Sequence, residues 1–168
     1  MFTTEWTTSP REFEVAIERD FHIPVADGIT LDSDLFRPDA PGKFPVILCA
    51  HPYNKQAQST PMLPEGVSYR RAFIESGDFN FYVRRGYVMV IMNIRGTGAS
   101  DGVFANRNPD ERTIRDIYDA IEWLAEQDWC DGNVGMMGVS YLSVVQKRVA
   151  AMKPPHLKTI FAFYGWTE

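Results

Sequence analysis

The chain has 168 residues, of which 45% are hydrophobic, 13% aromatic and 23% charged. That composition excludes a disordered or low-complexity chain and fits one globular domain. A net charge of -5 argues against nucleic acid as a partner, and no stretch approaches the roughly 18 uninterrupted apolar residues of a membrane-spanning helix.

The N-terminus shows no basic region followed by an apolar core, so we expect no secretory signal. The two cysteines, Cys49 and Cys130, belong to no motif. Free thiols are therefore favoured over a disulfide or a metal site, and we expect a reducing, cytoplasmic compartment.

The first forty residues predict a tail and then antiparallel strands. Residues 1–12 are predicted to be an N-terminal tail, and residues 13–168 to be the folded part. From Phe13 apolar and charged residues alternate, as in a half-buried strand. Asp27-Gly28 is a hairpin turn signal, after which apolar residues alternate again. Residues 38–45 are a turn-rich linker.

After residue 45 the pattern changes to short apolar runs separated by helical periodicity. The runs predict buried strands, and apolar spacing of three and four predicts helices. Strands that alternate with helices indicate an α/β fold with a mostly parallel sheet and right-handed crossovers. The expected strands cover 45–50, 87–94, 134–138 and 157–164, and the expected helices cover 80–85, 113–126 and 141–152. The irregular stretch 51–80 is predicted to be functional.

The strongest chemical signal is Gly138-Val139-Ser140-Tyr141-Leu142, where a strand meets a helix. A serine on such a tight turn is a candidate nucleophile, and the N–H groups that follow it can bind developing negative charge. The usual pattern has a second glycine where Leu142 stands; here the small residue comes one later, at Ser143. The alternative is that Ser140 caps the helix.

A second signal follows the first buried strand, at His51-Pro52-Tyr53-Asn54-Lys55. In an α/β-hydrolase this loop supplies the other half of the oxyanion hole, and a tyrosine hydroxyl can donate there. Alternatively, Tyr53 packs at the base of the loop. His51 is expected to support the loop rather than act as a base.

A third signal is the glycine-rich stretch Arg95–Gly102. A dinucleotide site needs a glycine where Asp101 stands and a helix that begins at once, and neither is present. We expect a close backbone turn near the active-site edge, with Arg95 and Asp101 bonded internally.

Five segments in this order resemble the N-terminal part of the X-Pro dipeptidyl-peptidase (S15) and cocaine-esterase-like hydrolases, called CocE/NonD. The resemblance runs from about Phe13 to Trp166. It is carried by Phe44–Leu48, His51–Lys55, Arg95–Gly102, Trp129–Met136 and Gly138–Tyr141.

The resemblance implies an N-terminal part of an α/β-hydrolase fold, with Ser140 as the acyl nucleophile. The backbone N–H of Tyr141 and the hydroxyl of Tyr53 would form the oxyanion hole. Trp166 would line the substrate pocket or, alternatively, fill a core or edge position. Such enzymes hydrolyse small esters, amides or short peptides without a metal or organic cofactor.

The catalytic base and its acid are missing from the expected order of serine, acid and histidine. After Ser140 the chain contains only Glu168 and His156. The helix from 141 to 152 should carry the chain roughly 18 Å away, which places His156 at the opposite edge of the sheet. His22, in the opening hairpin, is a poor candidate.

We therefore expect a fragment whose remaining hydrolase domain, helical cap and jelly-roll-like domain lie outside these residues. By itself it should be nearly inactive and prone to associate through its uncovered sheet edge. The competing hypothesis is a non-catalytic α/β module that binds a partner at that edge. A nucleotide-binding domain is a third alternative.

Overall fold

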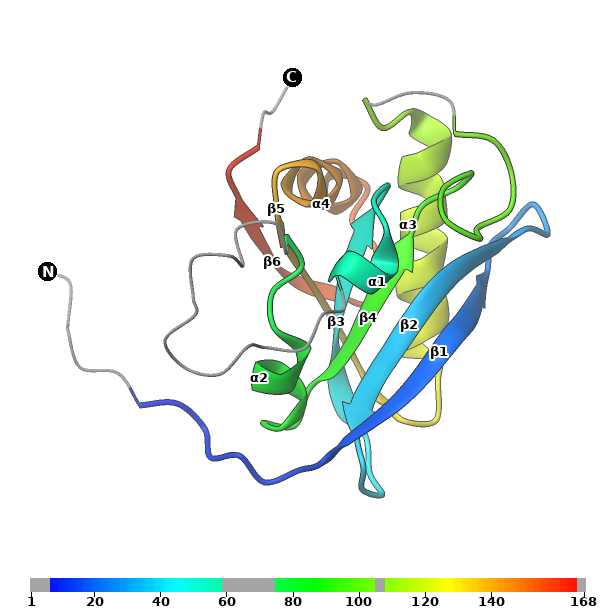
Figure 1. Cartoon of the computed structure of the whole chain (residues 1–168). Helices are drawn as coiled ribbons and strands as arrows, with labels where there is room; N and C mark the ends of the chain where they lie inside the picture. The colour runs from blue at the N-terminus through cyan, green and yellow to red at the C-terminus, as the bar shows by residue number, and fades with distance from the viewer. Residues whose placement is uncertain (1–6, 59–74, 105–107, 166–168) are drawn as a thin grey trace, which may run out of the picture.

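A six-stranded mixed sheet organises residues 7–58, 75–104 and 108–165, which are those that the computed structural model describes (Figure 1). The strand order is β1-β2-β4-β3-β5-β6. β1, β2 and β4 pair antiparallel in succession, whereas β4, β3, β5 and β6 run parallel. The strands are β1 (Val15–Pro24), β2 (Thr30–Pro38), β3 (Phe44–His51), β4 (Val88–Asn93), β5 (Cys130–Val139) and β6 (Leu157–Phe163).

The predicted hairpin around Asp27-Gly28 is confirmed, although β1 begins at Val15 rather than at Phe13. β5 begins earlier than predicted, because the expected turn at 131–133 is part of the strand. The register between β3 and β5 is irregular there, so β5 has extra residues opposite the start of β3. Turn residues in the sequence here mark a bulge instead of a strand end.

Helices cover both faces of the sheet (Figure 1). α3 (Glu111–Ala125) and α4 (Tyr141–Ala151) pack on the face that includes Val46 and Leu48 of β3. The short α2 (Phe79–Val83) packs on the opposite face, with Ile47 and Cys49. Successive residues of a strand point to opposite faces, so a strand covered on both sides needs the continuous apolar runs seen in the sequence. A further short helix, α1 (Lys55–Gln58), lies in the stretch predicted to be irregular; residues 59–74 of that stretch lie outside the described residues.

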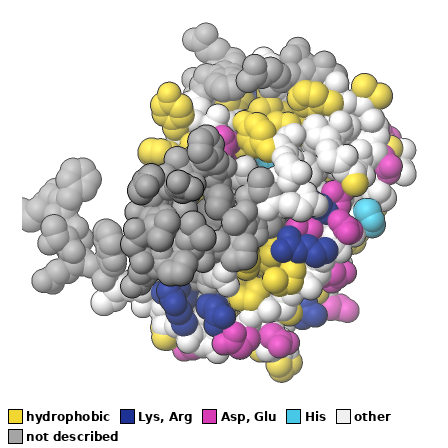
Figure 2. Space-filling model, in the orientation of Figure 1, with side chains coloured by type: hydrophobic (Ala, Val, Ile, Leu, Met, Phe, Trp, Pro, Cys, Tyr) yellow, Lys and Arg dark blue, Asp and Glu magenta, His cyan; other side chains and the backbone are white. Residues whose placement is uncertain are grey.

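The prediction that 157–164 is a buried strand is wrong for one of its faces. β6 lies at the end of the sheet, and only its alternate residues, such as Ile160, pack against the core. Phe161 and Phe163 point the other way and are 65% and 60% exposed. Beside Phe161 a groove of about 520 Å³ crosses the sheet face, next to Ile47 and Met137. Figure 2 shows hydrophobic side chains at the upper left of the molecule, where Figure 1 places β6.

Candidate active site

Ser140 occupies the turn between β5 and α4 in a backbone conformation that L-residues rarely adopt. Its φ is 59° and its ψ is -117°. The side chain makes no capping hydrogen bond, so the alternative of a helix cap is wrong. The backbone N–H of Ser140 donates to the carbonyls of Phe163 (3.1 Å) and Tyr164 (2.8 Å). Strain of this kind is kept where the surroundings enforce it and is concentrated at functional sites.

The packing around the turn explains why a leucine, Leu142, stands where the usual pattern has a second glycine. A Cβ on Gly138 would lie 2.5 Å from the Leu142 Cβ, so the leucine occupies the space that the missing side chain leaves. The next residue, Ser143, lies where α4 contacts the chain at the end of β6. A Cβ on Gly165 would lie 2.8 Å from its Oγ, so this contact requires small residues on both sides.

The first N–H groups of α4 are available at the same turn. The first helical hydrogen bond runs from the N–H of Val144 to the carbonyl of Ser140 (3.2 Å). The N–H of Tyr141 therefore precedes the intrahelical ladder, as at any helix start. Tyr141 itself is 4% exposed, and burial raises the pKa of its hydroxyl, which stays protonated.

Tyr53 lies close to this turn, on the loop that follows β3. Its ring meets the ring of Tyr141 edge-on, with 6.5 Å between centroids, and stacks on the ring of His51 at 6.1 Å. Tyr53 remains 38% exposed. The structure thus brings together Ser140, Tyr141 and Tyr53, three site residues that the sequence predicted.

His51 supports this loop, as predicted. It is fully buried, and its Nδ1 accepts a hydrogen bond from the backbone N–H of Tyr53 (3.2 Å). Burial lowers the pKa of His51 to about 4, so the ring is neutral near neutral pH. On the other side of the loop, the amide of Asn93 donates to the carbonyl of Tyr53 (2.6 Å).

A buried ion cluster that the sequence did not predict fastens the end of the same loop. The ammonium of Lys55, 3% exposed, pairs with Asp32 and Asp34 of β2, which are almost fully buried, and with Asp20 of β1. Burial alone would lower the pKa of Lys55, but the hydrogen bonds to the three carboxylates outweigh it and raise the pKa. Arg19 also pairs with Asp34. The indication of this cluster in the sequence was that two aspartates, Asp32 and Asp34, interrupt an otherwise apolar strand.

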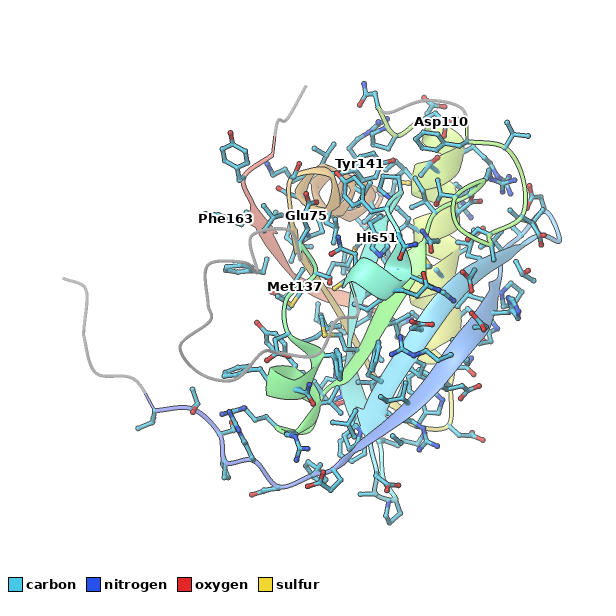
Figure 3. The ribbon with its side chains drawn as sticks, viewed as in Figure 1. His51, Glu75, Asp110, Met137, Tyr141 and Phe163 are labelled. Atoms are coloured by element: carbon cyan, nitrogen blue, oxygen red, sulfur yellow. The ribbon has the colours of Figure 1, made fainter. Side chains whose placement is uncertain are left out.

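Glu75 is a second residue that sequence reasoning missed. Burial raises the pKa of its carboxyl group, and Tyr53 opposes that rise. Its carbonyl accepts from the N–H of Val139 (3.1 Å), next to Ser140. Figure 3 shows Glu75, His51 and Tyr141 near one another, above the ends of β3 and β5. In the sequence, the indication that Glu75 belongs to the site was limited to its position in the irregular stretch 51–80.

The two other histidines lie far from Ser140. Nδ1 of His156 is 2.8 Å from Oε2 of Glu122, at the start of β6, whereas Ser140 contacts the end of that strand. A strand rises about 3.3 Å per residue, so roughly 20 Å separate the two ends. His22 lies on β1, with three strands between it and β5. At about 4.8 Å per strand, that is roughly 19 Å.

The Arg95–Gly102 loop makes a close backbone turn, in which the N–H of Gly96 donates to the carbonyl of Asp101 (2.9 Å). The prediction that the side chains of Arg95 and Asp101 are bonded within the loop is wrong, because both bond to residues outside it. Arg95 binds Asp116 (2.7 and 2.8 Å) and Asp27 (2.9 Å). Asp101 accepts from both the N–H and the hydroxyl of Thr30, each at 2.9 Å. These bonds fasten the loop to α3 and β2.

Trp166 lies outside the described residues. Within the described ranges, no group of three or more histidine, cysteine, aspartate or glutamate side chains is arranged to hold a metal ion. Cys49 and Cys130 are buried free thiols. None of the helices in the described part is long and apolar enough to cross a membrane.

Comparison with known proteins decides the family. The family described as X-Pro dipeptidyl-peptidase (S15 family) matches residues 27–168. The chain belongs to this S15 family. It is 41% identical over 144 residues to the cocaine esterase of Rhodococcus sp. (strain MB1 Bresler), covering 82% of this chain and 22% of the esterase. It is 32% identical over 151 residues to a putative Xaa-Pro dipeptidyl-peptidase of Bacillus cereus, covering 75% of this chain and 25% of that protein.

A solved structure confirms the predicted fold. The crystal structure of a CocE/NonD family hydrolase from Staphylococcus aureus superposes with a TM-score of 0.74 at 37% identity, covering 89% of this chain and 27% of that one. The S15 chain described here therefore has the N-terminal part of an α/β-hydrolase fold. It spans about a quarter of the length of the relatives that it matches.

Proposed function

We propose that this S15 chain carries the nucleophile and the oxyanion hole of a serine hydrolase that cleaves small esters, amides or short peptides. The observation that supports this most is the strained conformation of Ser140 at the junction of β5 and α4. Oγ of Ser140 attacks the substrate carbonyl. The N–H of Tyr141 and the hydroxyl of Tyr53 then donate to the oxyanion, and departure of the alcohol or amine leaves an acyl-serine that water hydrolyses.

The base that takes the Ser140 proton, and the acid that orients it, come from outside these residues in this proposal. His156 and His22 are too distant, and His51 is buried with Nδ1 occupied by the backbone of Tyr53. Since an unassisted serine is a weak nucleophile, we expect the 168-residue chain to be nearly inactive. The compartment we propose is the cytoplasm, where the buried thiols of Cys49 and Cys130 would stay reduced.

Covalent labelling with a fluorophosphonate tests the proposal. We expect slow labelling of the chain and fast labelling of a longer protein that includes the sequence following residue 168, both abolished by Ser140→Ala. Ser143→Ala is the matched control, because Ser143 is a buried serine one helical turn away and has no assigned role. Equal labelling of the Ser140→Ala variant and the unmodified chain would refute the assignment.

A second candidate function is association through β6. The exposure of Phe161 and Phe163 on an edge strand favours it, because an unpaired edge with apolar side chains binds other chains. In this case the chain would act as a non-catalytic module, and Ser140 would resist labelling in every context.

A further inference from the structure

Both main-chain polar groups of Tyr53 are bonded to buried side chains. Its N–H donates to Nδ1 of His51 (3.2 Å), and its carbonyl accepts from Nδ2 of Asn93 (2.6 Å). His51 and Asn93 are fully buried, and they are paired with each other in the parallel register of β3 and β4. The main chain of Tyr53 is therefore held from two sides by the last residues of adjacent strands, although its own side chain reaches solvent.

The side chain of Asn93 is held in turn by the glycine-rich loop Arg95–Gly102. Only the nitrogen of an amide side chain donates, and Nδ2 of Asn93 has a second acceptor in Oγ1 of Thr97 (3.4 Å). The main chain of Asn93 is bonded to the same loop, because its carbonyl accepts from the hydroxyl of Ser100 (3.0 Å). The loop thus determines where the Asn93 amide lies.

Gly98 of this loop makes room for the amide. Its φ is +57°, and a Cβ at this position would lie 2.5 Å from Oδ1 and 2.7 Å from Cγ of Asn93. Atoms do not pack so closely, so a larger residue at position 98 would push the amide away from the Tyr53 carbonyl. The glycine-rich loop, to which the proposed function assigns no role, therefore closes around the side chain that holds Tyr53.

The position of the Tyr53 main chain affects catalysis because an oxyanion donor acts over a narrow range of distances. The donor must lie about 2.7–3.1 Å from the place of the oxyanion, and a misplacement of about 1 Å can cost about 100-fold in rate. The phenol oxygen is at the far end of the ring, so a small rotation of the main chain moves this oxygen further than it moves the Cα. The neighbouring rings of His51 and Tyr141 contact the Tyr53 ring but do not fix its main chain.

We propose that Asn93 is a positioning residue for the reaction of Ser140. Through its bond to the Tyr53 carbonyl, and in the space that Gly98 leaves, Asn93 sets where the Tyr53 hydroxyl meets the oxyanion. This inference rests on the proposed function, because it assumes that Tyr53 donates to the oxyanion. Asn93 is fully buried and acts through Tyr53 rather than on the substrate.

The test is the rate at which a fluorophosphonate labels Ser140 in Asn93→Ala and in Gly98→Ala, each expressed relative to the unmodified protein. The first variant removes the amide, and the second displaces it. We expect each to slow labelling by about 10- to 100-fold, the loss for a displaced oxyanion donor. Neither should slow labelling more than Tyr53→Phe does, because a positioning residue cannot contribute more than the group that it positions.

Gly102→Ala is the matched control for Gly98→Ala. Gly102 belongs to the same loop and also has a positive φ (+87°), but a Cβ there would meet the side chain of Arg95 (2.9 Å) and not Asn93. This variant should label nearly as fast as the unmodified protein. If Asn93→Ala lowers the midpoint of thermal unfolding below the assay temperature, the comparison of Gly98→Ala with Gly102→Ala decides the question.

A Tyr53→Phe background separates positioning from a general structural effect. In this background Asn93→Ala and Gly98→Ala should slow labelling little further, because the hydroxyl that they misplace is already absent. Two residues that act through one group show such non-additive losses, whereas a separate disturbance of the Ser140 turn would add its full effect in both backgrounds.

The inference is overturned if either folded variant labels as fast as the unmodified protein, if Gly102→Ala slows labelling as much as Gly98→Ala, or if the losses are the same in the Tyr53→Phe background. None of these results affects the proposed function as long as Ser140→Ala abolishes labelling and Tyr53→Phe slows it. If Tyr53→Phe labels as fast as the unmodified protein, the proposed oxyanion role of Tyr53 fails, and the role of Asn93 fails with it.

Discussion

Replacing Lys55 with methionine should destabilise the protein strongly, although the substitution nearly conserves side-chain volume. The ammonium of Lys55 is 3% exposed and lies 3.2 Å from Asp34 and 2.7 Å from Asp20, in addition to its bond with Asp32. At about 3 Å and an effective dielectric of about 20, each pair attracts by about 5 kcal/mol before desolvation is subtracted. Removing the cation leaves Asp32 buried without its counter-charge.

The expected cost is about 3–5 kcal/mol, the range for removing one partner of a buried ion pair. Asp34 keeps its pair with Arg19, so Asp32 bears most of the loss. For a domain of this size each kcal/mol lowers the midpoint of thermal unfolding by about 2–4 °C, which predicts a fall of roughly 6–20 °C. Urea unfolding followed by tryptophan fluorescence measures the free energy directly.

Two further variants isolate the cause. Lys43→Met, at an exposed position in the turn before β3, should change the free energy of unfolding by less than about 0.5 kcal/mol. Asp32→Asn in the Lys55→Met background should recover more than half of the lost free energy of unfolding, because it removes the buried charge that has no counter-charge. The reasoning is refuted if Lys55→Met costs less than about 1 kcal/mol, or if the double variant is no more stable than the single one.

Two more predictions concern the Ser140 turn and the sheet edge. Gly138→Ala should cost more than Gly132→Ala, by about 1–3 kcal/mol in urea unfolding, because both positions have positive φ but only the new methyl at Gly138 would meet atoms closer than 3 Å. Equal costs would show that the packing around the turn relaxes freely. Phe161→Thr with Phe163→Thr should lower self-association of the chain in sedimentation velocity and leave its unfolding free energy within about 1 kcal/mol. Unchanged association would show that the chain associates through another surface.

The sequence was informative wherever the signal was local. The turn residues Asp27-Gly28 and the apolar spacing in 113–126 predicted the hairpin and α3 within two residues of their observed bounds. The order of the motifs predicted both the family and the juxtaposition of Tyr53 with the Ser140 turn. The roles of these residues remain predictions, because the contacts show proximity and not chemistry.

The tertiary structure decided what depends on partners that are distant in the chain. Lys55 pairs with Asp32, which lies 23 residues earlier in the chain, and no pattern in the sequence between them predicts this pair. Glu75 reaches the Ser140 turn through one backbone bond to Val139, 64 residues later. The apolar run of β6 looked buried, yet its position at the sheet edge leaves Phe161 and Phe163 exposed. Periodicity reports which face of an element is apolar, but sheet order determines which of those faces another element covers, and sheet order is set by long-range pairing.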